Sequence, residues 1–407
     1  MRILFLTSRM PYPPVGGDRF RVFHVLRTAA EAGHSVHIVT FDTHARDPVE
    51  IGPLERIAAS VDVVPLPRFV SVLRSLRALP GRFPLQAAYY RSRRMRDRVD
   101  AALKRIRPDV AVTHLFRMAP YALPHLGRGR TRWVIDLTDV ISAGIERSMP
   151  YRRGLSRWIY RVEGPRIRDY ESRVAPRFDE CWVISETEAR LLTALAPSAR
   201  IRVVPNGMGP ERFRVGVARE PARLLFLGFH EVFHNQDAVR FLVQEIFPRV
   251  RAAVPEATLE IAGKGSESLG AWARVPGVHV AGFVPDLEAA LGRATVFVAP
   301  HRFAAGVQNK VLQALTSGTP VVTTPIVRSG LEPLPADVLR VAEDADGIAA
   351  HVTALLRDPR GATALGERGR AWARRRFTWD VSLEALEAVR RVAGPARSDG
   401  RPSAVSV

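Results

Sequence analysis

The chain has 407 residues, of which 46% are hydrophobic and 25% charged, and its formal net charge is +19. This length allows two domains with separate cores; the single cysteine excludes an intrachain disulfide. No run of about 18 apolar residues is present, which excludes a transmembrane helix. The apolar start, MRILFL, is too short for a signal peptide, so we expect a cytoplasmic protein.

The first half alternates apolar runs with helical stretches. RILFLT (2–7) is followed by the loop PYPPVGG, a helical pattern over 18–32 and the apolar run SVHIVTF (35–41). This order is typical of a β-loop-α-β unit in a parallel sheet. Further strands are expected at 61–66, 109–114, 132–137, 180–185 and 201–206, and the longest helix at 151–176.

The second half repeats this order after a linker near 207–222. Strands are expected at 222–228, 258–263, 278–284, 295–300, 319–324 and 339–344, with helices at 235–253, 286–293, 307–317, 346–357 and 361–375. We therefore predict an α/β protein with two Rossmann-like, doubly wound parallel-sheet domains, 1–206 and 207–378, followed by a helix at 379–394 and a disordered tail at 395–407.

In doubly wound sheets, ligands bind at the carboxyl ends of the strands. The residues at these positions that attract attention are Gly16, Gly17, His114, Asp136, Asp139, Gly228, Lys264 and, in the 300–310 loop, Arg302.

The loop PPVGGDRF joins the first strand to the first helix. Gly16 and Gly17 would let the backbone approach a ligand closely, and the helix N-terminus favours an anion. A plain turn is the alternative. The loop is not G-x-G-x-x-G, so a bound dinucleotide is not expected.

A stronger candidate site is the segment AAGVQNKVLQALTSGTPVVTT. A helix beginning near Gly306 directs unpaired N–H groups toward the cleft, with Asn309 near its start, Lys310 one turn in and Gln313 beside Lys310. A diphosphate fits this position; the alternative is a solvated Lys310. Lysine is rare in this chain, and its retention here favours a role for a compact ammonium group.

The strand ends of the first half carry residues with open roles. His114 could act as a base or bind an acceptor hydroxyl, or it could be satisfied within the protein. Asp136 and Asp139 could bind acceptor hydroxyls or cap the next segment.

The excess positive charge is almost entirely arginine and is densest at 89–107. This segment is either a solvated helix face or a contact with an anionic membrane surface. The arginines are spread over the chain without a recognised module, so nucleic acid is not an expected partner. The motifs CxxC, HExxH, GxSxG and GxxxxGK[ST] are absent, and no bound metal or cofactor is expected.

Several segments in this order resemble family 4 (group 1) glycosyltransferases: the opening MRILFLTSRMPYPPVGGDRF, the turn VVPNGM, LLFLGFHEVFHNQDAVRFL, AGFVPDLEAALGRATVFVAP, GVQNKVLQALTSGTPVVTT and RRRFTWDVSLEALEAV. The resemblance covers nearly the whole chain and extends to the subgroup associated with exopolysaccharide gene clusters.

This resemblance implies a GT-B fold and metal-independent, retaining transfer from a nucleotide-diphosphate sugar to a glycan or polyprenyl-linked acceptor. It implies that 1–206 binds the acceptor, that 207–378 binds the donor, and that the last helix crosses back to the first domain. Gly16 and Gly17 would close over the donor, His114 would face the transferred sugar, Lys310 would bind the diphosphate and Gln313 the ribose.

The sequence departs from the family pattern in its charged residues. Gln313 and Ala305 replace two glutamates, and Phe229 and Asn235 stand near the positions of an arginine and a lysine. Lys310, Lys264 and Arg302 are the remaining candidates for neutralising the leaving diphosphate. These losses keep two alternatives open: a degenerate nucleotide- or glycan-binding protein, and a nucleotide-sugar epimerase.

Overall fold

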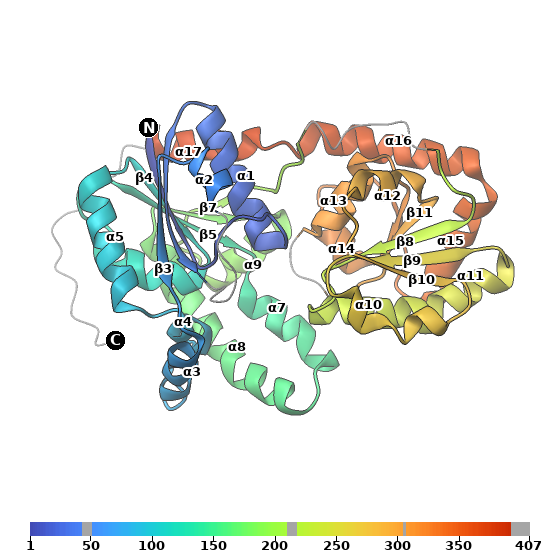
Figure 1. Cartoon of the computed structure of the whole chain (residues 1–407), viewed down its shortest axis with the longest axis horizontal. Coiled ribbons are helices and arrows are strands. Elements are labelled where there is room, and N and C mark those ends of the chain that lie inside the picture. Colours follow the sequence, from blue (N-terminus) through green and yellow to red (C-terminus); the bar gives the residue numbers. More distant parts are fainter. Residues whose placement is uncertain (43–50, 210–217, 304–306, 392–407) are drawn as a thin grey trace.

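The computed structural model is shown in Figure 1. It describes residues 1–42, 51–209, 218–303 and 307–391. These residues contain two parallel β-sheets, of seven and six strands, each with helices packed on it.

The N-terminal sheet has the strand order β3-β2-β1-β4-β5-β6-β7. Its strands are β1 (Arg2–Thr7), β2 (Ser35–Asp42), β3 (Ser60–Pro65), β4 (Val110–His114), β5 (Arg132–Thr138), β6 (Glu180–Val183) and β7 (Ile201–Val203). The helices are α1 (Gly17–Glu31), α2 (Gly52–Glu55), α3 (Arg68–Arg77), α4 (Leu85–Tyr89), α5 (Arg93–Ile106), α6 (Ala119–Ala122), α7 (Ile141–Ser148), α8 (Gly154–Val174) and α9 (Glu186–Leu195). Single 3₁₀ turns are η1 (Phe116–Met118), η2 (Leu123–His125), η3 (Met149–Tyr151) and η4 (Ala175–Arg177).

Both faces of this sheet are buried, which explains why its central strands are apolar at successive positions rather than at alternate ones. Ile3 and Phe5 of β1 pack in one core with α1 and the last helix, α17 (Asp380–Arg391). Leu4 and Leu6 pack in the other core with α5 and α8.

The C-terminal sheet has the order β10-β9-β8-β11-β12-β13. Its strands are β8 (Arg223–Leu227), β9 (Thr258–Ala262), β10 (Val278–Gly282), β11 (Val296–Ala299), β12 (Val321–Thr323) and β13 (Arg340–Val341). The helical elements are α10 (Phe233–Phe241), the π-helical η6 (Leu242–Ile246), α11 (Phe247–Ala253), η7 (Ser266–Leu269), η8 (Trp272–Arg274), α12 (Leu287–Arg293), α13 (Asn309–Thr316), α14 (Pro325–Ser329), α15 (Ala345–Arg357) and α16 (Pro359–Arg376).

The end of the chain returns to the N-terminal domain. Helix α16 lies over the C-terminal domain and α17 over the N-terminal one (Figure 1). The Trp379 ring, just before α17, stacks on His24 of α1 with centroids 5.0 Å apart. Gly207 lies against this crossing, and a Cβ there would stand 2.5 Å from the Trp379 nitrogen. Only glycine fits where the two interdomain segments touch.

The predicted fold class is confirmed, and each expected strand appears within a few residues of its expected position. One expected helix, 235–253, is interrupted by the π-helical turn η6. Pro248 follows this turn and has no amide hydrogen for the carbonyl one turn earlier, a mismatch that a π-turn accommodates. Among the described residues, no helix is both long and apolar enough to span a membrane.

Candidate active site

Each sheet has one point where the strand order reverses. In the N-terminal sheet it lies between β1 and β4, and in the C-terminal sheet between β8 and β11. His114 ends β4, and the loops after the other three strands carry Gly16, Gly228 and the segment leading to Lys310. Because ligands of doubly wound sheets bind at such reversals, the topology assigns the candidate site to the junction of the domains.

Helices α1 and α13 meet at this junction. Gly16 precedes α1 with φ 95°, a conformation that favours glycine. Gly17 begins the helix, and a Cβ on it would lie 3.9 Å from Asn309 Nδ2, in the first turn of α13. The structure therefore brings together two helix N-termini that the sequence separates by almost 300 residues, and their N–H groups favour an anion.

A hydrogen-bonded chain of buried side chains crosses from β5 to α13. Asp136 accepts a bond of 2.7 Å from Arg21 Nε, and Arg21 Nη1 donates to Asn206 Oδ1 at 2.9 Å. Asn206 Nδ2 then donates to Asn309 Oδ1 at 2.8 Å. Arg21 is fully buried and Asp136 is 4% exposed. In the described residues, Asp136 therefore holds Arg21, and its acceptor-binding role stays a prediction.

His114 lies at the end of β4, 3% exposed, with Nε2 3.5 Å from Thr138 Oγ1. Burial lowers its pKa to about 4, against the opposing effect of Asp136 and Asp18. His114 is thus a neutral imidazole at neutral pH, able to exchange hydrogen bonds with a hydroxyl. Leu115, the next residue in the chain, has φ 66°, and Thr138, the neighbour on β5, has φ 62°. Two residues in contact with or adjacent to His114 therefore have strained backbone.

Asp139 lies one residue beyond Thr138 and has a carboxylate oxygen to spare. Its Oδ1 is buried with no hydrogen-bond partner among the described residues. Burial, and then the charge of Glu188, raise the pKa of Asp139 to about 7. Glu188 itself accepts bonds from the Val140 amide (2.7 Å) and Arg147 (3.1 Å). Asp139 therefore has an unused acceptor oxygen, whereas both oxygens of Asp136 already accept hydrogen bonds.

Lys310 projects from the first turn of α13 to Asn235 and His301, two polar residues that come after β8 and β11 in the chain. Its Nζ donates to Asn235 Oδ1 and lies 3.3 Å from Nε2 of the buried His301. Burial lowers the pKa of Lys310 to about 7. No aspartate or glutamate of the described chain forms an ion pair with Lys310.

Gly228 and Lys264 occupy the ends of the neighbouring strands β8 and β9. A Cβ on Gly263 would stand 2.0 Å from the Gly228 carbonyl oxygen, so the two backbones approach as only glycine permits. Lys264 is exposed, with Nζ 5.9 Å from the centroid of the Phe229 ring.

Arg302 has its own carboxylate. Its Nε and Nη2 donate to Asp237 at 2.9 and 2.5 Å, and the guanidinium lies 5.2 Å from the Tyr151 ring centroid. The hydrogen bond to Asp237 raises the pKa of Arg302. Its charge is already balanced by Asp237, so it is a weaker candidate for the diphosphate than Lys310.

Two further candidates complete the set. Gln313 lies half-buried on α13, one turn after Lys310. Gly306 and the substituted Ala305 lie outside the described residues.

Sequence reasoning missed Arg21, Asn206 and His301 as members of the site. His301 is the second residue after β11, so the rule that directed attention to Arg302 should have included it. Asn206 stands in the quoted turn VVPNGM. Arg21 gave no signal, because nothing local marks one arginine of α1 as the buried one.

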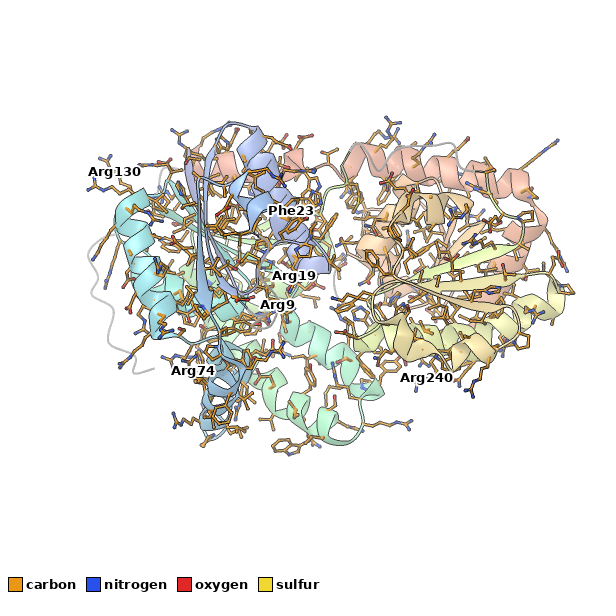
Figure 2. All side chains as sticks on the ribbon, in the orientation of Figure 1. Arg9, Arg19, Phe23, Arg74, Arg130 and Arg240 are labelled. Atoms are coloured by element: carbon orange, nitrogen blue, oxygen red, sulfur yellow. The ribbon has the colours of Figure 1, made fainter. Side chains whose placement is uncertain are left out.

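Figure 2 adds cations on the N-terminal side: Arg9 and Arg19 lie beside the start of α1. Arg9 Nη1 is 3.5 Å from Asp18 Oδ2. Within the described ranges, no group of three or more His, Cys, Asp or Glu side chains could hold a metal ion. The chemistry that the site offers is binding of an anion between two helix starts, beside a buried neutral His114 and a buried unused oxygen of Asp139.

Two family models match the chain in the same order as its domains. The glycosyl transferase 4-like domain matches residues 16–207, and the glycosyl transferases group 1 model matches residues 221–358. The chain belongs to the group 1 glycosyltransferases. The protein is therefore an enzyme, a glycosyltransferase. Strands β2 to β7 of its seven-stranded sheet lie within the match to the first family model, and its six-stranded sheet lies within the match to the second.

Two curated relatives support the assignment. The glycogen synthase of Mycobacterium tuberculosis is 28% identical over 408 residues, with 95% of this chain and 92% of the relative covered. A mannosyltransferase of Mycolicibacterium smegmatis, described as a GDP-mannose-dependent alpha-(1-6)-phosphatidylinositol monomannoside mannosyltransferase, is 31% identical over 224 residues. That match covers 47% of this glycosyltransferase and 56% of the relative.

Solved structures show the same fold at low sequence identity. Sucrose-phosphate synthase from Thermosynechococcus elongatus superposes with a TM-score of 0.72 at 16% identity, covering 96% of this glycosyltransferase and 99% of that chain. HepE of Anabaena, solved with UDP, superposes with a TM-score of 0.66 at 14% identity and covers the same shares. The GT-B fold of this glycosyltransferase is thereby confirmed.

Proposed function

We propose that this glycosyltransferase moves a sugar, with retention of configuration and without a bound metal, from a nucleotide-diphosphate sugar to a glycan or polyprenyl-linked acceptor in cell-surface or exopolysaccharide synthesis. Two relatives support the donor class: HepE is solved with UDP-glucose as well as UDP, and the mycolicibacterial relative is described as GDP-mannose-dependent.

The observation that carries the proposal is the state of Lys310. Its ammonium is partly buried without a carboxylate partner in the described chain, on the helix whose N-terminus meets that of α1. A buried cation without a counter-charge is unfavourable until an anion arrives. A diphosphate would supply that charge and also bind the free N–H groups of α13.

The same arrangement stabilises the leaving group. As the bond from sugar to diphosphate breaks, negative charge grows on the diphosphate, and a fixed cation beside it lowers the barrier. Lys310 provides this charge. Further cations are the exposed Lys264 and Arg9 and the half-buried Arg19, the last two beside the start of α1. Gln313 would bind the ribose through neutral hydrogen bonds, because an amide carries no charge.

The N-terminal side would hold the transferred sugar and the acceptor. Burial lowers the pKa of His114 to about 4, so its imidazole is uncharged at neutral pH. It can therefore accept or donate a hydrogen bond without forming an ion pair with the diphosphate. The unpartnered Asp139 Oδ1 is buried, so an acceptor hydroxyl would reach it only once this side chain turns outward. Asp136 would act indirectly by fixing Arg21 and, through Asn206, the position of α13.

The test is nucleotide-sugar turnover by the purified protein. UDP and GDP release is measured for a panel of UDP- and GDP-sugars, with the donor first chosen by thermal shift, since a ligand at about 100 times its Kd adds about 2.7 kcal/mol of stability. We expect His114→Ala and Lys310→Ala each to lower turnover at least about tenfold, or about 1.4 kcal/mol of transition-state stabilisation. Wild-type rates in both variants would overturn the site assignment.

A further inference from the structure

The large hydrophobic side chains that remain exposed gather on two helices. Among the described residues there are nine such side chains, and seven lie on α3 and the first turns of α8. The most exposed are Phe69 (75%), Leu155 (72%) and Trp158 (56%). Exposed apolar groups are normal when scattered, but a cluster of this kind marks an interaction surface.

Most apolar residues of helix α3 face solvent rather than the domain on which the helix packs. Phe69, Val72 and Leu76 follow one another at spacings of three and four residues and face solvent. The residue that is fully buried is Ser71, and Ser75 Oγ donates inward to the Leu85 carbonyl at 3.1 Å. This helix therefore uses its polar side for folding and leaves its apolar side free.

Helices α3 and α8 are joined. Arg166 of α8 donates to the carbonyls of Ala78 and Leu79, directly after α3, and Glu163 accepts from the Leu85 and Gln86 amides at 2.9 Å. Both helices lie at the lower edge of the N-terminal domain in Figure 1. We call the exposed residues of α3 and of 153–161 the apolar-arginine surface.

The charges of this surface have one sign. No Asp or Glu occurs between Asp62 and Asp97 or between Glu146 and Glu163. The exposed arginines of the surface, none of which forms an ion pair with another described residue, are Arg68, Arg77, Arg153, Arg157 and Arg161. Apolar side chains interleaved with unpaired arginines are complementary to a surface that is apolar below and anionic above.

Helix α5, which carries the densest basic sequence, differs in both respects. Its apolar residues are buried in the N-terminal core, and Arg98 and Arg105 form ion pairs with Asp62. Its exposed side is a solvated charged face, so the basic segment picked out by sequence is not the part of the chain best suited to a membrane.

We infer that the apolar-arginine surface docks on an anionic lipid bilayer. Phe69, Leu155 and Trp158 would enter the headgroup region while the arginines bind lipid phosphates. A second copy of this chain is the poorer occupant, because its identical surface would place arginine against arginine.

The surface borders the domain junction. Tyr151, three residues before α8, stacks on Phe303 of the C-terminal domain at 4.5 Å, and Arg152 lies 5.0 Å from the Phe233 ring. Docking would therefore place the membrane beside the candidate active site. That a polyprenyl-linked acceptor enters the active site from this membrane rests on the proposed function. The docking of the surface on a membrane does not.

The experiment is flotation of the full chain with vesicles of phosphatidylcholine alone and of phosphatidylcholine with phosphatidylglycerol. We expect binding to the anionic vesicles only, and at least about tenfold weaker partitioning of the double variant Phe69→Ser/Trp158→Ser, since each exposed side chain contributes its transfer to the headgroup region. The matched control is Arg94→Gln/Arg96→Gln on α5, which removes two charges from a face without exposed apolar residues and should stay within about threefold of wild type.

Three outcomes would overturn the inference: no binding of wild type to anionic vesicles, equal binding to neutral vesicles, or an equal loss in the α5 control. A concentration-dependent dimer in sedimentation that the Phe69→Ser/Trp158→Ser change abolishes would identify a second copy as the occupant instead. Nucleotide-sugar hydrolysis without vesicles is measured in parallel and should be unchanged by both double variants. If neither the wild type nor the variants hydrolyse any nucleotide-sugar, but the wild type still binds anionic vesicles, the proposed function is refuted and the membrane-docking inference is not.

Discussion

Binding of a nucleoside diphosphate should be coupled to the protonation of Lys310. In the free protein, burial lowers the pKa of Lys310 to about 7. A bound diphosphate favours the charged form and would return the pKa toward the ordinary value of about 10.4. As the pH rises above 7, the free protein loses this proton, and binding must take it up again.

The size of the effect follows from the protonated fraction. That fraction falls from about one half at pH 7 to about one hundredth at pH 9, so the Kd for UDP should rise about fiftyfold, approaching about 1.4 kcal/mol per pH unit. The phosphates of UDP contribute little over this range, because with a last pKa of about 6 they are already about nine-tenths ionised at pH 7. Isothermal titration calorimetry with UDP across this range, in buffers of different ionisation enthalpy, measures both the affinity and the proton uptake.

Two substitutions isolate the residue. Lys310→Arg keeps a charge that does not titrate, so the dependence should flatten to the residual contribution of Asp139, whose pKa is also about 7. Lys264→Arg is the matched control on an exposed lysine of the same domain and should keep the wild-type slope. A flat profile in the wild type, or the same slope in Lys310→Arg, would refute the reasoning.

Three further predictions concern stability. Arg21→Met leaves Asp136 buried without its partner and should lower the free energy of unfolding in urea by about 3–5 kcal/mol. The double variant Arg21→Met/Asp136→Leu should restore part of this loss. An equally unstable double variant would contradict the role of the ion pair. Because the folded pKa of His114 lies below its ordinary value, stability should fall as the pH drops from about 6.5 toward 4, by about 2 kcal/mol at pH 5, and urea unfolding of His114→Gln should show a smaller fall. Gly263→Ala should give no soluble folded protein, whereas Gly282→Ala, at φ 71° with no atom within 4 Å of the new Cβ, should fold with a loss of about 1–2 kcal/mol; equal soluble yields would show that the close approach is not limiting.

The fold was accessible from sequence because its signals are local. Buried parallel strands are short apolar runs, and the turn between Ala32 and β2, with Gly33 at φ 79°, ends a helix as the sequence predicts. The rule that ligands bind at strand ends then selects His114 and the loop that leads to Lys310.

The partners of these residues were not accessible, because they depend on which side chains meet across the fold. Asn235 was noted only as a replacement for a family cation, yet it accepts a hydrogen bond from Lys310 and holds His301. Arg302 has the residue type and the loop position expected of a diphosphate ligand, but it forms an ion pair with Asp237 of α10. No spacing in the sequence distinguishes a paired arginine from an available one.

The direct test of the central claim is turnover of a nucleotide-diphosphate sugar, followed by proton NMR of the freshly released sugar. We expect release from at least one donor, with the anomeric configuration of the donor retained in the first product, and at least about tenfold less release by Lys310→Ala. Inverted configuration in the first product would contradict the retaining mechanism. Donor binding without any release, or release by Lys310→Ala at the wild-type rate, would contradict the proposed active site.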